Sequence, residues 1–181
     1  LGLDNDIFCF NVESAVELEI IDELAAAKNK VASVALRINP EVDAHTHAKI
    51  TTGMKENKFG INLSQLGGVL DKLKEMKNVK LIGIHSHIGS QITDMSSFRN
   101  LVIRFNEIQE ELEAHGVTVE NLNFGGGLGI DYYHPNHLSI PAFDNYFAAI
   151  HKLLQVRPGQ QVHFEPGRSI VAQCGTLISK V

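Results

Sequence analysis

The chain alternates between apolar runs of strand length and longer stretches with helical periodicity. The predicted strands cover residues 7–12, 31–39, 79–88, 121–124 and 161–165. The predicted helices cover residues 13–28, 64–76, 98–115 and 142–154. Strands that alternate with helices in this way are typical of a parallel β/α architecture.

The predicted helix over 98–115 has the clearest pattern. Ser96 and Ser97 precede it as suitable N-cap residues, and Gly116 follows it as a suitable stop. Its apolar positions repeat every three or four residues and therefore share one face. These positions are Leu101, Phe105, Ile108 and Leu112.

Within the predicted strands, side chains alternate between an apolar face and a polar or glycine face. Both faces of an open doubly wound sheet are covered by helices, so its strands tend to be apolar throughout. A closed barrel turns one face inward and carries its functional groups at the C-terminal strand ends. The pattern therefore favours a barrel. The apolar face carries Val34, Leu36 and Ile38; Ile82, Ile84 and Ile88; Leu122 and Phe124; and Val162 and Phe164. The opposite face includes Arg37, His85, His87, Asn123, His163 and Glu165.

Length and composition limit the possibilities. The 181 residues are fewer than the roughly 250 of a complete eight-fold barrel, so we expect part of one, and residues 175–181 resemble an interrupted strand. No apolar run reaches the ~20 residues of a membrane span. The net charge of −5 and the lack of a Lys/Arg cluster argue against nucleic-acid binding. Cys9 and Cys174, expected to be buried thiols, suit a reducing compartment and hence the cytoplasm.

A glycine run, Gly125 to Gly129 interrupted only by Leu128, directly follows a predicted strand. Glycines let backbone N–H groups approach an anion such as phosphate, although a tight turn explains them equally well. A dinucleotide-binding fingerprint does not fit, because it needs glycine where Ile130 stands.

A second segment, Glu165-Pro166-Gly167-Arg168, ends another predicted strand. Glu165 is placed to fix a cationic ring nitrogen, Gly167 to offer a backbone N–H to phosphate, and Arg168 to bind phosphate or carboxylate. The structural alternative is a Pro-Gly turn beside a surface ion pair.

A third segment holds His85 and His87, which share one face of a strand. This spacing occurs in metal-dependent barrel hydrolases, and that reading stays open, although no further ligands are evident. In the other reading His87 stacks on a planar cofactor with Ser90 nearby, and His85 is a hydrogen-bonded core histidine. Arg37 either holds a cofactor oxygen or forms a structural ion pair. Residues 51–58 suggest a loop over the site, in which Lys58 could touch substrate.

Together, and in this order, these segments resemble the alanine-racemase-like class of pyridoxal-phosphate (PLP) enzymes, and within it the diaminopimelate decarboxylase family. The resemblance covers nearly the whole chain. Its motifs are residues 10–14 (FNVES), 36–40 (LRINP), 58–61 (KFGI), 83–91 (GIHSHIGSQ), 123–130 (NFGGGLGI) and 165–172 (EPGRSIVA).

The resemblance implies a partial PLP-dependent (β/α)8 TIM barrel, with residues 1–181 forming part of the PLP-binding domain. It implies that His87 stacks on the pyridine ring as a catalytic residue and that Glu165 pairs with the ring nitrogen. It assigns no resident metal. The remaining implied cofactor contacts are Ser90, Gly126, Gly127, Gly167, Arg168 and Arg37, with Arg168 also expected to bind a substrate carboxylate.

The implied reaction is decarboxylation of meso-diaminopimelate to L-lysine, in lysine biosynthesis, by a homodimer. Decarboxylases of ornithine, arginine or carboxynorspermidine are the alternatives within the class, and a non-catalytic PLP-binding protein is a further one. No segment resembles the family's Tyr-Ala-x-Lys-like PLP-lysine strand or its C-terminal β domain, and Lys58 is in the wrong place to replace that lysine. We therefore expect this chain alone to be inactive.

Overall fold

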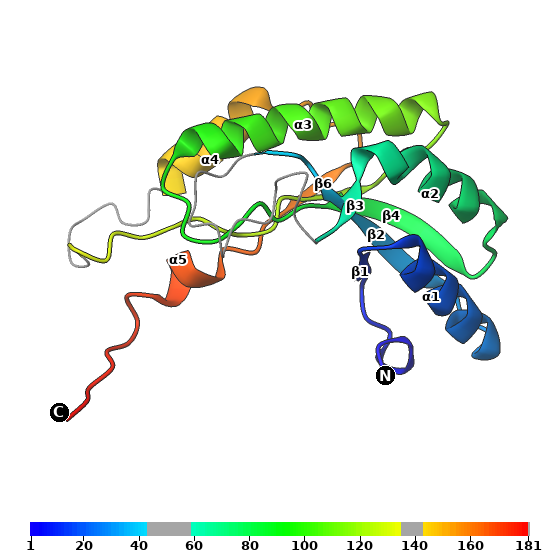
Figure 1. Cartoon of the computed structure of the whole chain (residues 1–181), viewed down its shortest axis with the longest axis horizontal. Helices are drawn as coiled ribbons and strands as arrows, with labels where there is room; N and C mark the ends of the chain where they lie inside the picture. The colour runs from blue at the N-terminus through cyan, green and yellow to red at the C-terminus, as the bar shows by residue number, and fades with distance from the viewer. Residues whose placement is uncertain (43–58, 135–142, 181) are drawn as a thin grey trace.

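The computed structural model describes residues 1–42, 59–134 and 143–180. Strands and helices alternate along the chain (Figure 1). The strands are β1 (Phe10–Val12), β2 (Ala32–Asn39), β3 (Ile61–Asn62), β4 (Val79–His85), β5 (Asn121–Asn123) and β6 (Gln161–His163). The helices are the 3₁₀ turn η1 (Leu3–Asn5), α1 (Ala15–Ala27), α2 (Leu63–Glu75), α3 (Met95–Ala114), α4 (Phe143–Leu153) and α5 (Gly167–Val171).

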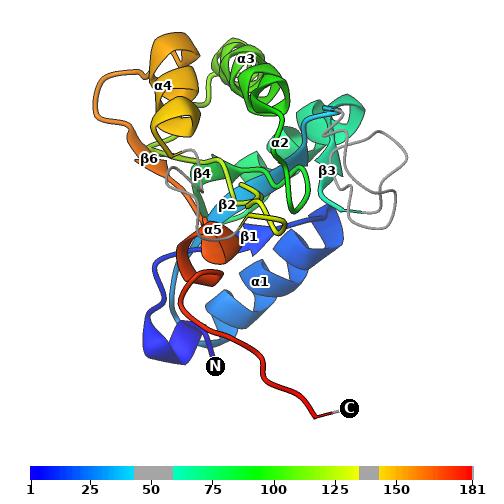
Figure 2. The ribbon, with the colours of Figure 1, turned by 90° about the vertical axis from the view of Figure 1, so that its left-hand side faces the viewer.

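All strand pairs described are parallel, and the sheet order is β1-β2-β4-β5-β6, with the short β3 also paired to β2. Strand order thus follows chain order, as in a β/α barrel, whereas the order reverses in a doubly wound sheet. Figure 2 shows α1, α2, α3 and α4 following one another around one side of the sheet. The predicted α/β fold, part of a barrel, is confirmed.

One apolar row crosses the sheet on the helix side. Val12, Leu36, Ile84, Leu122 and Val162 are joined in register from β1 to β6. The first four are at most 1% exposed and belong to the main core cluster. Burial of each such side chain is worth about 1.5–3 kcal/mol, so this row anchors the sheet to its helices.

The alternation predicted for 82–88 is wrong at Ile82. The register between β2 and β4 shifts after Val34, where Leu81 is the partner of Val34 and Gly83 is the partner of Ala35. An extra residue in one strand reverses the faces on one side of the bulge. Leu81 therefore packs against the core cluster.

The predicted face of the long helix is confirmed, because Leu101, Phe105, Ile108 and Leu112 are all at most 1% exposed in α3. Its predicted start is three residues late. The side chain of Asp94 accepts a hydrogen bond of 2.8 Å from Ser96 N and caps the helix at Met95. The end is as predicted, with Gly116 at a φ of +75°.

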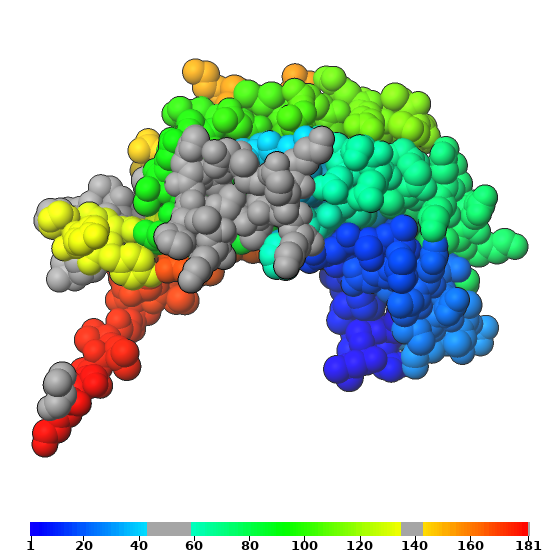
Figure 3. Space-filling view, viewed as in Figure 1, coloured from blue at the N-terminus to red at the C-terminus, as the bar shows by residue number. Residues whose placement is uncertain are grey.

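The end of the described chain differs from expectation. Residues 175–180 form no helix or strand and extend away from the rest of the molecule (Figures 1 and 3). A strand needs a neighbour for its backbone hydrogen bonds, and none of the described strands pairs with this segment. Cys174 is exposed and Cys9 only partly buried, so the prediction of two buried thiols is wrong. Among the described residues, no helix is long and apolar enough to cross a bilayer.

Candidate active site

A polar row crosses the other face of the sheet at the C-terminal strand ends. Arg37, His85, Asn123 and His163 are joined in register from β2 to β6. They directly follow the apolar row, so the two-residue alternation turns them to the side away from the helices. In a β/α barrel this edge carries the chemistry.

Glu165 lies just beyond β6 and joins this row. Its Oε1 accepts a hydrogen bond of 2.9 Å from Asn123 Nδ2 and lies 3.5 Å from His85 Nε2. The His85 imidazole, with the Asn123 amide and His87, lowers the pKa of the Glu165 carboxyl from 4.5 to about 2, against the effect of desolvation. Glu165 is therefore an ionised carboxylate at neutral pH, as its expected role requires.

His85 is buried, with a side chain 5% exposed. Neither of its ring nitrogens has a hydrogen-bond partner among the described residues, because the 3.5 Å contact with Glu165 is too long for a well-formed bond. The prediction of a hydrogen-bonded core histidine is thus half right. A buried polar group without a partner costs about 1–3 kcal/mol.

His87 follows β4 and is half-buried. Its Nδ1 accepts a hydrogen bond of 3.3 Å from Gly126 N, which links it to the glycine run. Desolvation, and then the nearby Arg37 and His85, lower the pKa of His87 below its usual 6.5, partly offset by Glu165. An uncharged imidazole at neutral pH suits contact with a flat aromatic ring.

The glycine run is packed against the ends of its neighbouring strands. A Cβ on Gly126 would lie 2.2 Å from the backbone oxygen of Glu165, and one on Gly127 would lie 2.4 Å from that of Gly89. Close packing therefore explains part of the run. Among the described residues, no group accepts a hydrogen bond from the Gly127 N–H, which leaves this donor for a ligand.

Arg168 bridges two other segments. Its guanidinium donates to Ser90 Oγ over 3.1 Å and to the hydroxyl of Tyr132, and it lies over the Tyr132 ring. The predicted residues Ser90 and Arg168 are thus in contact. Tyr132 was missed by the sequence reasoning, because an exposed loop tyrosine carries no periodic signal. Gly167 lies in open space, but its N–H donates to Glu165 O over 2.8 Å.

Arg37 is engaged by Glu13, the residue after β1. The ion pair measures 2.5 Å, and the other carboxylate oxygen of Glu13 accepts a 3.1 Å hydrogen bond from Gly60 N. Of the two roles open to Arg37, the structure contains the ion pair, while a cofactor role stays a prediction. Lys58 and residues 51–58 lie outside the described residues.

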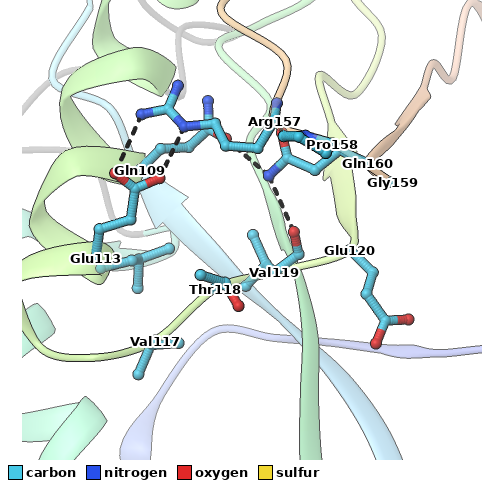
Figure 4. A pocket seen from close by; sticks show the side chains of 11 residues that line it. Gln109, Glu113, Val117, Thr118, Val119, Glu120, Arg157, Pro158, Gly159 and Gln160 are labelled. Carbon is cyan, nitrogen blue, oxygen red and sulfur yellow. Dashed lines mark hydrogen bonds and ion pairs between the residues drawn. The ribbon is translucent and has the colours of Figure 1, made fainter.

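A separate cavity of about 380 Å³ lies at the opposite ends of the strands, beside Glu120 and Gln160, which precede β5 and β6 (Figure 4). Four of its polar side chains are already paired with one another: Arg157 Nε lies 2.7 Å from Glu113 Oε1, and Gln160 Nε2 donates to Gln109 Oε1 over 2.8 Å. A barrel uses this end for stability, so the polar row and Glu165 remain the candidate site.

The sequence model of the family described as "Pyridoxal-dependent decarboxylase, pyridoxal binding domain" matches residues 2–172. The chain belongs to this family. The matched region contains the polar row, the glycine run, Glu165 and Arg168, so it includes the whole candidate site.

Named relatives within the decarboxylase family are similar over nearly the whole chain. Diaminopimelate decarboxylase of Bacteroides thetaiotaomicron is 61% identical over 181 residues, which are 100% of this chain and 47% of that protein. The crystal structure of diaminopimelate decarboxylase from Helicobacter pylori complexed with L-lysine has a TM-score of 0.83 at 34% identity, covering 93% of this chain and 42% of that one.

The Methanocaldococcus jannaschii diaminopimelate decarboxylase, solved in co-complex with L-lysine, has a TM-score of 0.79 at 37% identity, and covers 93% of this chain and 40% of that one. The chain thus spans about half the length of the relatives it matches.

The residues present fit pyridoxal phosphate. An ionised Glu165 matches a protonated ring nitrogen, the uncharged His87 imidazole matches a ring face, and the Gly127 N–H matches a phosphate oxygen. Among the described residues, no three His, Cys, Asp or Glu side chains come together as a metal site.

Proposed function

We propose that this chain forms the cofactor-binding part of a PLP-dependent diaminopimelate decarboxylase, and that the whole protein converts meso-diaminopimelate to L-lysine and CO₂. The observation that carries the proposal is Glu165, an ionised carboxylate at the strand ends within reach of His85 and Asn123. The names of the relatives support the substrate, and the family description supports the cofactor.

In this proposal each residue has one task toward the cofactor. Glu165 binds the ring nitrogen and keeps it protonated, and His87 covers one face of the ring. The Gly127 N–H donates to the phosphate, and Gly126 and Gly167, whose N–H groups donate to His87 and Glu165 in this structure, line the phosphate site. The protonated ring supplies the electron sink that the departing CO₂ requires.

Arg168 is the proposed ligand of a substrate carboxylate or of the phosphate, and Ser90 lies close to the cofactor. Their mutual contact of 3.1 Å fixes the guanidinium, and Tyr132 supports it from the other side. An arginine fork suits a carboxylate better than a lysine does, because it offers paired donors. Arg37 supports the site through Glu13 and is proposed to reach a cofactor oxygen.

We further propose that residues 1–181 are part of a larger PLP-binding barrel in a cytoplasmic homodimer. Apolar side chains at one end of the sheet support further packing there: Val16 is 62% exposed, and Ile20 and Leu24 are each 51% exposed on α1. At the other end, a hollow is lined by Phe147, Val162 and Phe164 among others. Single surface leucines are ordinary, but such stripes mark contact surfaces.

The test is a lysine-formation assay of the whole protein with PLP and meso-diaminopimelate, compared with ornithine, arginine and carboxynorspermidine. We expect activity with meso-diaminopimelate and a loss of at least about 100-fold in the Glu165→Gln variant. The matched variant Glu120→Gln, which makes the same change before β5 at the opposite ends of the strands, is expected to retain activity. Preference for another amino acid overturns the substrate assignment, and full activity of Glu165→Gln overturns the assigned role.

A further inference from the structure

His85 combines deep burial with unused hydrogen-bonding capacity at the centre of the polar row. Its side chain is 5% exposed, and neither ring nitrogen has a hydrogen-bond partner among the described residues. Its register neighbours are Arg37 on β2 and Asn123 on β5. Buried polar groups are nearly always paired, so this one calls for a functional explanation.

The acceptor within reach of this imidazole is Glu165. Arg37 has no acceptor atom, and the Asn123 amide nitrogen donates to Glu165 Oε1 over 2.9 Å. That same oxygen lies 3.5 Å from His85 Nε2, slightly beyond a well-formed hydrogen bond. A shift of a few tenths of an ångström closes this gap.

We propose that His85 is the positioning residue for Glu165: its Nε2–H donates to Oε1 and, with Asn123, keeps the carboxylate ionised and aimed at the cofactor ring nitrogen. This inference rests on the proposed function and adds to it the residue that acts through Glu165. The carboxylate oxygen held from two sides leaves the second oxygen for the ring.

An imidazole suits this task chemically. It donates a hydrogen bond while uncharged, whereas lysine or arginine would bring a positive charge beside a protonated ring. The titratable groups facing Glu165 in the described structure are His85 and His87, from β4 and the residues after it. The positive charge of Arg37 lowers the pKa of His87. Of these side chains, His85 is the buried one, 5% exposed and 3.5 Å from the carboxylate.

The test measures the Glu165 carboxyl directly, by ¹³C NMR of the chain labelled at glutamate side chains, with Glu165→Gln identifying the signal. His85→Phe keeps a flat ring but removes both nitrogens, and we expect it to raise the pKa of Glu165 by about one unit or more. His85→Gln retains an N–H donor and is expected to restore most of the difference. The control His115→Gln changes a histidine at the end of α3, outside the candidate site, and is expected to leave this pKa unchanged.

A second measurement needs no substitution in the core. In the ¹⁵N spectrum of the histidine-labelled chain, we expect His85 to carry its proton on Nε2. We expect the Nε2 resonance of His85 to shift in the Glu165→Gln variant. Glu165 is 47% exposed, so this substitution leaves the core unaltered. This result decides the matter if His85→Phe does not fold. A proton on Nδ1, or an unchanged resonance, overturns the proposal, as does an unchanged Glu165 pKa in a folded His85→Phe.

Binding of pyridoxamine 5′-phosphate, followed by calorimetry, separates this inference from the proposed function. We expect weaker binding by His85→Phe than by His115→Gln. If the ligand does not bind the unaltered chain although His85 and Glu165 are coupled, the cofactor assignment fails and the pairing stands. If it binds His85→Phe as tightly as the unaltered chain, the positioning role fails and the cofactor site stands.

Discussion

The side-chain amide of Asn123 donates a hydrogen bond of 2.9 Å to Glu165, and so joins the end of β5 to the residues that follow β6. The same carboxylate lies 3.5 Å from His85 on β4. Three neighbouring strand ends therefore converge on one ionised group. This convergence has consequences for stability as well as for the proposed chemistry.

The first prediction concerns acid. Because the folded chain lowers the pKa of Glu165 from 4.5 to about 2, the carboxylate contributes stability above about pH 4.5, and that contribution is lost as the pH falls toward 2. Glu165→Gln should therefore destabilise the chain more at pH 6 than at pH 3 in urea unfolding. Equal destabilisation at both pH values would contradict this. Glu120→Gln, whose carboxylate is 68% exposed, is the control and should change stability by less than about 0.5 kcal/mol.

The second prediction concerns the glycine run. Gly126→Ala should be strongly destabilising, because its Cβ would lie 2.2 Å from the backbone oxygen of Glu165, and a strand end must move to accept it. Gly68→Ala in α2 is the matched control, since a Cβ there meets nothing within 4 Å. It should raise stability by about 0.5–1 kcal/mol through helix propensity. Thermal unfolding of both variants checks the pair, and a harmless Gly126→Ala would refute the packing described.

The third prediction concerns the aromatic core. Phe124 is 1% exposed. Its ring stacks on those of Phe105 and Phe164, with ring centroids 4.1 Å and 5.9 Å apart, respectively. Phe124→Ala should lower the free energy of unfolding by about 3–5 kcal/mol. Phe8, which is 65% exposed, provides the comparison, and its alanine variant should lose far less. Similar losses in the two variants would show that the core is packed differently.

The fourth prediction concerns thiol reactivity. Burial raises the pKa of Cys9 to about 11, whereas Cys174 is exposed. Since the thiolate is the reactive form, iodoacetamide at pH 8 should modify Cys174 rapidly and Cys9 slowly. Peptide mass spectrometry gives both rates, and Cys174→Ser should abolish the fast phase. Rapid modification of Cys9 in the folded chain would contradict the burial seen here.

Periodicity in the sequence was enough to predict the barrel-like fold and the two faces of most strands. Leu36 and Arg37 lie on opposite faces as their alternation indicates, and the same holds for Leu122 and Asn123. The bulge at Ile82 in β4 was not predictable, because an inserted residue changes strand pairing without changing the apolar pattern. β3 was missed because two residues are too few for a periodic signal.

The candidate site was predicted in part for the same reason. Strand ends that follow one another along the chain lie side by side, so His87, the glycine run and Glu165 were expected to meet. The partner of Arg37 was not predictable, because the pair with Glu13 depends on how the residues after β1 are oriented. Nor does any sequence pattern report that His85 lacks a hydrogen-bond partner among the described residues, since this depends on how its buried ring is placed at the strand ends.

The most direct test of the central claim is a crystal structure of this chain with pyridoxamine 5′-phosphate. We expect the ring nitrogen within hydrogen-bond distance of Glu165, the ring against His87, and the phosphate at residues 125–129. A ligand bound without contact to Glu165, or seated in the cavity beside Glu120 and Gln160, would contradict it.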